Sequence, residues 1–490
     1  MKKFISIFLA ITMLFSVSGC AKETVQPAKS LDLMPVENPN VYTFDRFGDE
    51  VMPIGGYIGP TPGFGWKGNY YPSQITDYHF GQVSDCGLNF IVGMKPNYKQ
   101  QSEDVINSLY YADKNDVMYF VCDTGLFQVT ETNAANPDNY TYLSLDDFKE
   151  RVEIYKNYNS FAGLVCRDEP WANMFDQCKE ILYYFNETFD DNKLLYLNSH
   201  SMQCPKGWFG GGSKSTDADE RAMTLDGYMD KWFESFPTLG YYSYDTYPFL
   251  TEGTDYIRPY MFLNYELVRR KSTEAGVPFW TFMQVGGRWS GSSEWRYTNE
   301  GEMLWQVNTA LAFGAKGYTY YSYNTPPEQV NSAEGDEGLV GRGGQKNENW
   351  YFAQKANRQT KACDHILMKS EFKGMIHVLS GKADSTNSIL FAGTDNEGIN
   401  RDYTDVLIDE FREVKSITGD NSITGCFNYQ GRTMLYVVNN SITRDKAKVT
   451  IKFDDNRIYS VIQRAQERTG VSKELTLTFA PGEGACVVIG

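Results

Sequence analysis

The chain has 490 residues, of which 22% are charged and 15% aromatic, and its formal net charge is -16. This length exceeds what one small core needs and predicts roughly two or three domains. The acidic balance argues against a nucleic-acid partner, because no basic patch is available to neutralise phosphates.

Residues 1–20 have the organisation of a bacterial export signal. Lys2 and Lys3 precede an apolar stretch over 4–17, and Val17-Ser18-Gly19-Cys20 follows. The stretch is short for a permanent membrane span, and the segment resembles a lipoprotein signal whose Cys becomes lipidated. We expect an exported protein, anchored through Cys20 on the periplasmic or cell-surface side of the membrane. The alternative is an ordinary cleaved secretory signal, in which Cys20 has no role.

The next segment, 21–45, is polar and proline-containing, and we interpret it as a tether. No later stretch has the length and apolarity of a membrane span, so the lipid is the only membrane contact that we expect. The oligomeric state is left open.

From residue 46 the chain alternates short apolar runs with longer amphipathic runs, which is typical of parallel β-α units. The predicted strands span 51–58, 90–94, 117–123, 161–167, 193–198, 239–244, 278–284 and 317–323. The predicted helices span 73–86, 103–114, 145–158, 174–188, 222–236, 256–275, 302–313 and 351–367. This series predicts a (β/α)8 TIM barrel over 46–368. A doubly wound sheet is the rival architecture, but 55–60 lacks the glycine spacing of a phosphate loop.

After residue 369 the pattern changes to short strands separated by turns. The predicted strands span 388–392, 425–429, 433–438, 448–453, 459–463 and 474–479. They predict a small antiparallel β-sandwich over 369–490. We expect this domain to pack against the barrel, with carbohydrate contact as the alternative role.

Catalytic groups of a TIM barrel lie at the carboxyl ends of its strands, so polar residues at those positions are candidates. Glu169 follows the fourth strand, and Pro170 ends that strand. Partial shielding by Trp171 would raise the pKa of Glu169, as an acid catalyst requires. The alternative is that Asp168-Glu169-Pro170 only caps the next helix.

Asp245 ends the sixth strand, and Tyr247 follows it. We expect Tyr247 to stack on a sugar ring or to stabilise a charged transition state; the alternative is a solvated Asp and a core Tyr. Sugar rings present apolar C–H faces to aromatic rings, and their hydroxyls need polar partners. The residues predicted to contact substrate are Asp123, Trp171, Asn198, Tyr247, Gln284, Trp289 and Tyr323.

Cleavage of a glycosidic bond needs a proton donor and usually a second carboxylate. With Glu169 as general acid, the sequence predicts a glycoside hydrolase acting on an oligo- or polysaccharide. The alternative is a non-catalytic glycan-binding lipoprotein on a barrel scaffold. We expect no cofactor. Metal catalysis is not predicted either, because no pair among the four histidines has zinc-ligand spacing.

Three segments together resemble barrel glycoside hydrolases of the clan that includes family 42 β-galactosidases. They are Gly87-Leu88-Asn89, Asp168-Glu169-Pro170 and the run over 310–317. The resemblance implies that Glu169 is the acid/base, although Asp168 stands where the clan usually has Asn. The clan's nucleophile is a Glu ending strand seven, where this chain has Gln284, which cannot attack as a carboxylate.

Three residues or pairs could replace the missing carboxylate. Asp245 is the favoured second catalytic carboxylate, either as nucleophile or as base for an inverting water. Asp168 and Glu169 could instead act as a pair, similar to that of family 20 hexosaminidases, in which the substrate's acetamido group attacks. This version requires a kink at Asp168. Glu294, in the loop after strand seven, is the third candidate.

Overall fold

A computed structural model describes residues 43–93, 102–123, 126, 144–189, 193–212, 215–250, 257–258, 260–286, 295–325, 338–379, 381–385 and 388–490. The predicted signal and Cys20, the predicted lipidation site, lie outside these residues. Within them, every helix is too short or too polar to cross a lipid bilayer.

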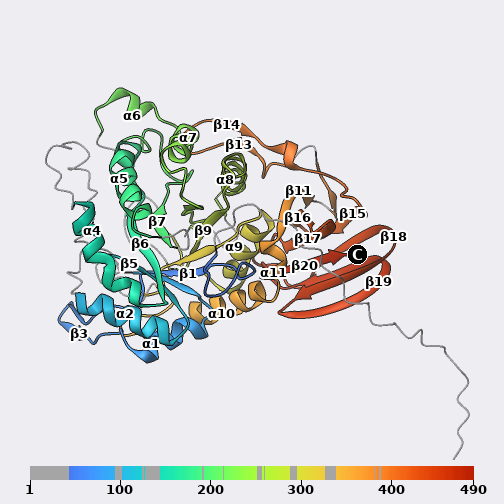
Figure 1. The fold of residues 1–490 in the computed structure, drawn as a ribbon. Coiled ribbons are helices and arrows are strands. Elements are labelled where there is room, and N and C mark those ends of the chain that lie inside the picture. Colours follow the sequence, from blue (N-terminus) through green and yellow to red (C-terminus); the bar gives the residue numbers. More distant parts are fainter. Residues whose placement is uncertain are drawn as a thin grey trace, which may run out of the picture.

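Eight parallel strands form the barrel in the first part of the chain (Figure 1). Their order around the barrel is β7-β6-β5-β4-β1-β10-β9-β8, and a bridge between Ser199 and Tyr244 joins β7 to β8. The predicted (β/α)8 barrel is therefore confirmed. The strands are β1 (Ile54–Tyr57), β4 (Phe90–Val92), β5 (Met118–Val121), β6 (Phe161–Asp168), β7 (Leu194–Asn198), β8 (Tyr242–Tyr244), β9 (Phe279–Gln284) and β10 (Tyr318–Tyr321).

Helices follow the strands, and local signals fix several of their ends. Asn299 and Glu302 form a capping box at the start of α9, and Gly276 ends α8 with a φ of 72°, which glycine adopts without strain. The helices are α1 (Asp77–Asp85), α2 (Ser102–Lys114), α4 (Leu145–Val152), η2 (Glu153–Asn157), η3 (Ala172–Met174), α5 (Phe175–Asn186), α6 (Ala218–Ala222), α7 (Leu225–Ser235), α8 (Met261–Ala275), α9 (Glu300–Ala312), α10 (Glu348–Lys361) and α11 (Asp364–Met368).

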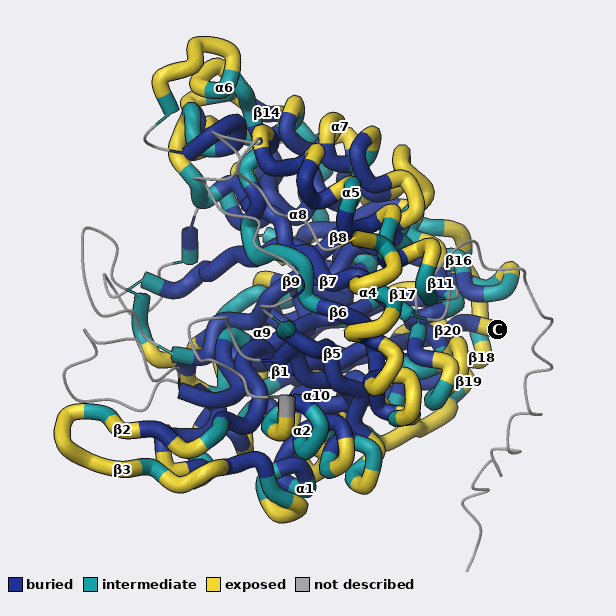
Figure 2. The backbone as a smooth tube through the Cα atoms, turned by 60° about the vertical axis from the view of Figure 1, so that its left-hand side comes forward, coloured by how far each residue is buried: buried dark blue, intermediate teal, exposed yellow. Residues whose placement is uncertain are grey.

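Large aromatic side chains fill the barrel interior. Phe90 on β4 and Trp280 on β9 come from strands that are not neighbours, yet their ring centroids lie 5.7 Å apart, so they meet across the barrel. Gly55 makes room for them, because a Cβ at this position would lie 2.1 Å from the Phe90 ring. Most strand residues are buried, although the second half of β6 is only partly buried. The hairpin of β2 (Phe64–Trp66) and β3 (Asn69–Tyr71), which was not predicted, projects into solvent (Figure 2).

The C-terminal part is one antiparallel sheet that folds over itself. The strand order is β15-β12-β11-β16-β17-β20-β18-β19, and β15 also pairs with β18. Its two faces enclose a separate apolar core, so the predicted β-sandwich is confirmed. The strands are β11 (Ser370–Leu379), β12 (Gly381–Ala383), β15 (Val414–Gly419), β16 (Ser422–Tyr429), β17 (Arg432–Asn439), β18 (Ala447–Gln463), β19 (Gln466–Phe479) and β20 (Gly484–Ile489).

Several details of this domain differ from the prediction. The strands expected at 448–453 and 459–463 are one continuous strand, β18, and four strands, β11, β12, β15 and β20, were not predicted. The strand expected at 388–392 is replaced by a small hairpin of β13 (Ala392–Thr394) and β14 (Asn400–Asp402), followed by the short η4 (Thr404–Val406). This hairpin lies beside α7 and α8 rather than in the large sheet (Figure 1).

Polar contacts join the sandwich to the barrel through α9. Asn308 accepts a hydrogen bond from the Tyr436 hydroxyl at 2.8 Å and donates one to the carbonyl of Gly482 at 3.0 Å. Trp305 donates from its indole nitrogen to Asn440 at 3.0 Å. The two domains therefore share a fixed interface.

Candidate active site

Glu169 lies at a sharp turn where β6 ends. It follows Asp168, the last residue of the strand, and its φ is 48°, in the left-handed region that non-glycine residues rarely adopt. Its backbone N–H donates to the carbonyl of Asn198 at 2.8 Å, which holds the turn against β7. Such a conformation costs on the order of 1 kcal/mol and persists only where the surroundings enforce it. The kink that the Asp168-Glu169 pair requires is present, one residue later than expected.

Asp245 comes directly after β8 and is almost fully buried, with 6% of its surface exposed. Burial raises the pKa of Asp245 well above its usual value, and the negative charges of Glu169 and Asp168 raise it further. A hydrogen bond between the carboxyl groups of Asp245 and Glu169 contributes in the same direction. Strands four and six of the barrel thus bring two carboxyl groups close enough to interact, and this interaction favours the protonated form of Asp245.

Aromatic rings lie beside these carboxyl groups. The Tyr247 ring centroid is 4.1 Å from that of Trp295 and 5.7 Å from that of Tyr321. Burial and the charges of Asp245 and Glu169 raise the pKa of Tyr247, so its phenol stays neutral. Tyr57 lies close as well, since the charge of Asp168 raises the pKa of its phenol in addition to burial. The neighbourhood combines acidic groups with apolar ring faces, as carbohydrate recognition requires.

The segment after β7 contributes residues that the sequence analysis did not select. The Nδ1 of His200 is 3.6 Å from the Oε1 of Glu169, and the side chain is 2% exposed. Gln203 donates from Nε2 to the Oδ2 of Asp245 at 3.3 Å. The signal that could have found them is their position directly after the fifth strand, in the polar run that begins at Asn198.

Asn198, which the sequence predicted to contact substrate, holds the side chain of Asp168 in place. Its Nδ2 donates to the Oδ1 of Asp168 at 3.3 Å, and its Oδ1 accepts from the hydroxyl of Ser243 at 2.9 Å. Because Asn198 itself is buried, these bonds fix the orientation of the Asp168 carboxylate. Asp168, Glu169, Asn198, Asp245 and Tyr247 are therefore brought together.

Other residues that were predicted to contact substrate or to act in catalysis lie in other parts of the chain. Asp123 accepts two hydrogen bonds from Arg151, at 2.8 and 2.7 Å, and one from the Tyr155 hydroxyl at 2.6 Å, which ties β5 to the helix after it. Trp171 packs edge-to-face on Trp208 at 6.4 Å. Trp289 and Glu294 lie outside the described residues.

Gln284 and Tyr323 have buried side chains that contact the scaffold. The Gln284 amide donates to the carbonyls of Phe249 and Arg296, at 3.0 and 2.9 Å, and accepts from the Phe249 N–H at 3.0 Å. These bonds occupy the amide that was expected to contact substrate. The Tyr323 side chain lies near Trp350 of α10 and Cys86 at the end of α1, in the helical layer.

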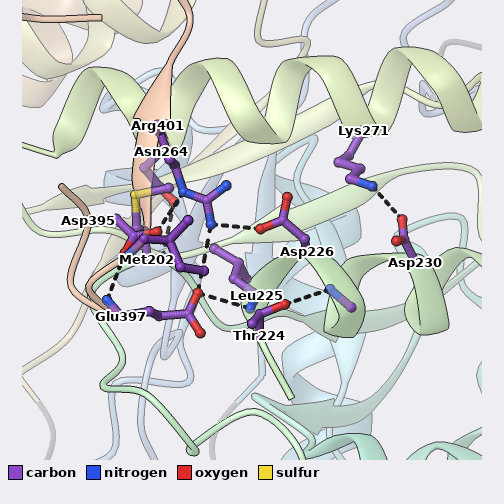
Figure 3. Close-up of polar contacts among 12 residues, drawn as sticks. Met202, Thr224, Leu225, Asp226, Asp230, Asn264, Lys271, Asp395, Glu397 and Arg401 are labelled. Carbon is purple, nitrogen blue, oxygen red and sulfur yellow. Dashed lines mark hydrogen bonds and ion pairs between the residues drawn. The ribbon is translucent and has the colours of Figure 1, made fainter. Parts of the chain in front are cut away.

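The β13–β14 hairpin of the C-terminal domain is attached to the barrel next to this site. Arg401 pairs with Asp226 of α7 and with Asp395 of the hairpin, each at 2.6 Å, and Glu397 accepts from the N–H of Leu225 at 3.1 Å (Figure 3). Asn396 then donates to the carbonyl of Gln203 at 2.8 Å. The C-terminal domain thereby holds the residue that contacts Asp245.

Comparisons with known proteins give distant likenesses only. No protein-family model matches the chain, and no curated protein matches it.

Among solved structures, the chain is similar to a β-galactosidase from the haloarchaeon Halorubrum lacusprofundi, with 12% identity over 63% of this chain and 58% of that one and a TM-score of 0.41. It is similar to a GH30 endoxylanase from Clostridium papyrosolvens, with 11% identity over 90% and 96% of the two chains and a TM-score of 0.42. A third similar structure is an exo-β-1,4-mannosidase from an Opitutaceae bacterium, with 13% identity over 68% and 63% of the chains and a TM-score of 0.43. The chain spans under two thirds of the length of the first and third of these proteins.

Proposed function

We propose that this protein is a glycoside hydrolase, with Glu169 as general acid/base and Asp245 as the second carboxylate. The observation that carries the proposal is that these two carboxyl groups lie close together at the carboxyl ends of barrel strands, where burial and like charge raise the pKa of Asp245. A pair of carboxyl groups, one of them able to donate a proton, is the usual equipment for breaking a glycosidic bond.

The chemistry follows from this pair. Glu169, whose side chain is 38% exposed, is accessible to a sugar and can protonate the departing glycosidic oxygen. Asp245 then stabilises the positive charge at the anomeric carbon or forms a bond to it. Retaining enzymes separate their carboxyl groups by about 5 Å and inverting enzymes by about 6.5–9.5 Å. The two carboxyl groups lie close enough to interact electrostatically, which favours the shorter spacing, so we propose retention.

A second mechanism is favoured by the turn at Glu169. The charges of both Asp168 and Glu169 raise the pKa values of Asp245 and Tyr247, so both neighbouring carboxylates lie within electrostatic range of the same two residues. This arrangement suits a substrate-assisted reaction, in which Asp168 orients a 2-acetamido group that attacks the anomeric carbon. It predicts that Asp168→Asn stops hydrolysis of acetamido sugars while Asp245→Asn does not.

The test is turnover by the purified protein on a panel of aryl glycosides and polysaccharides. Once a cleaved substrate is found, Glu169→Gln should lower kcat/KM by about 10²–10⁴-fold, because the proton donor is lost. The matched control is Glu187→Gln at the exposed end of α5, which should keep full activity. Full activity of Glu169→Gln would contradict the proposal, and a glycan that is retained without turnover would favour the binding-protein alternative.

We also propose that the protein is exported and anchored by lipid on Cys20. The support is the sequence of its first residues, with a basic start, an apolar stretch and the Cys. Cys20→Ser should move the protein from the membrane fraction to the soluble fraction of the cell. An unchanged membrane fraction would contradict lipid anchoring.

A further inference from the structure

Three different metal-binding side chains meet beside the site. Donor atoms of Glu169, His200 and Cys204 all lie within 4.8 Å of one another. The Nδ1 of His200 is 3.6 Å from the Oε1 of Glu169 and also 3.6 Å from the Sγ of Cys204. Cys204 is a free thiol. A carboxylate, an imidazole and a thiol therefore converge on one point.

Their spacing matches what one zinc ion requires. Zinc binds nitrogen at about 2.0–2.1 Å and sulfur at about 2.3 Å in a tetrahedron, which implies a separation of about 3.5 Å between the two donor atoms. The corresponding nitrogen–oxygen separation is about 3.3 Å. The two separations from the Nδ1 of His200, both 3.6 Å, lie within a few tenths of an ångström of these values. The Glu169 oxygen and the Cys204 sulfur lie within 4.8 Å of each other, so a closer approach of these two side chains would complete the site.

The segment that carries two of these ligands is held in place from several sides. The N–H of Met202 donates to Asn264 of α8 at 3.1 Å (Figure 3), and the N–H of Cys204 donates to the carbonyl of Ser201 at 3.0 Å. The His200 ring packs against Tyr228 at 5.7 Å. A preorganised set of ligands binds a metal without the cost of ordering the chain.

We propose that Glu169, His200 and Cys204 form an inhibitory binding site for Zn²⁺. Zinc takes the place of the Cys204 thiol proton, which passes to solvent, and it binds a lone pair of the Glu169 carboxylate. Glu169 can then no longer transfer a proton to a substrate. Three protein ligands leave the fourth position to water. The thiolate and the imidazole favour Zn²⁺ over Mg²⁺ and Ca²⁺, which prefer oxygen ligands.

The inhibitory part of this inference rests on the proposed hydrolase function, whereas metal binding does not. Binding is therefore measured separately, with Co²⁺ as a spectroscopic substitute for Zn²⁺. Titration of the full chain should give a thiolate-to-cobalt charge-transfer absorption that saturates at one equivalent, and added Zn²⁺ should abolish it. Cys204→Ser and Cys204→Ala should both lack the absorption, whereas Cys166→Ser, which removes another half-buried thiol, should keep it.

Inhibition is measured on any substrate that the protein turns over. We expect one equivalent of Zn²⁺ to suppress hydrolysis, a chelator to restore it, and Mg²⁺ to have no effect. In the Cys204 variants, each compared with its own metal-free rate, the Zn²⁺ concentration for half-inhibition should rise by at least about 10–100-fold, which is the usual cost of losing a residue that only supports a ligand.

Absence of the absorption in the wild-type protein, or its persistence in both Cys204 variants, would overturn the site. Binding without inhibition, or stimulation by Zn²⁺, would overturn its inhibitory role. Failure to find any hydrolysed substrate would count against the proposed function and would leave the cobalt titration to decide on the metal site.

Discussion

The substitution Asp245→Asn removes one charge from the pair of carboxyl groups and keeps the size of the side chain. Burial and the charges of Glu169 and Asp168 raise the pKa of Asp245 well above its ordinary value of 3.8. A carboxyl group whose pKa is higher in the folded than in the unfolded protein stabilises the fold fully at a pH below its unfolded-state pKa. This stabilisation is lost as the pH rises through its folded-state pKa. Asn does not ionise, so the variant escapes the loss.

The size of the effect follows from the contact between the carboxyl groups. Two unit charges about 4 Å apart repel by about 4 kcal/mol at an effective dielectric constant near 20. The raised pKa of Asp245 favours its protonated form, which limits the repulsion between the two carboxyl groups at neutral pH. We therefore expect the variant to be more stable than the wild type by about 1–3 kcal/mol. Activity should change in the opposite direction, with a fall of about 10²–10⁴-fold, equivalent to about 3–5 kcal/mol in the barrier.

The assay compares thermal unfolding of the two proteins at neutral pH and near pH 4. The melting temperature of Asp245→Asn should exceed that of the wild type at neutral pH, and the difference should shrink toward the acid end. Asp176→Asn is the control, because that side chain is 94% exposed and should change neither stability nor rate. A variant that is less stable at neutral pH, or a difference independent of pH, would refute the reasoning.

Three further substitutions test other contacts. Glu169→Gly should be more stable toward urea than Glu169→Ala by about 1 kcal/mol, because a φ of 48° strains only residues that have a Cβ. Equal stabilities of the two variants would contradict this strain. Gln284→Glu introduces the residue type that the similar clan has as nucleophile. It should lower the free energy of unfolding by about 2–5 kcal/mol without raising activity, because two carbonyls lose their hydrogen-bond donor. An unchanged melting temperature would argue against this. Arg401→Met should cost about 3–5 kcal/mol because it leaves Asp395 buried without its cation, whereas Arg412→Met on the surface should cost little in the same unfolding assay.

The barrel was predictable because its strands are buried on both sides and read as continuous apolar runs. The strand predicted at 278–284 corresponds to β9, whose six residues are all buried. The meeting of Glu169 and Asp245 was also predictable, although 75 residues lie between them in the sequence, since parallel strands present their carboxyl ends at one edge.

Other features depend on contacts that no local pattern contains. β18 was predicted as two strands because its middle is polar and exposed. Both halves pair with β19, on either side of an irregularity between Lys452 and Arg457. Gln284 looked like a ligand at a strand end, but the backbone of Phe249 and Arg296 takes up its amide. His200 and Cys204 lie in an irregular segment, where neither helical nor strand periodicity distinguishes a residue that faces the site.

The hairpin that bears Asn396 has a consequence for how this protein can change during evolution. Asn396 is 193 positions downstream of Gln203, yet the two are hydrogen-bonded, so inheritance of the barrel alone would leave the neighbourhood of Asp245 unsupported. Exchange of the C-terminal domain between related chains should therefore alter substrate preference even where every barrel residue is kept. Conversely, drift within 392–402 offers a route to new specificities that leaves Glu169 and Asp245 unchanged.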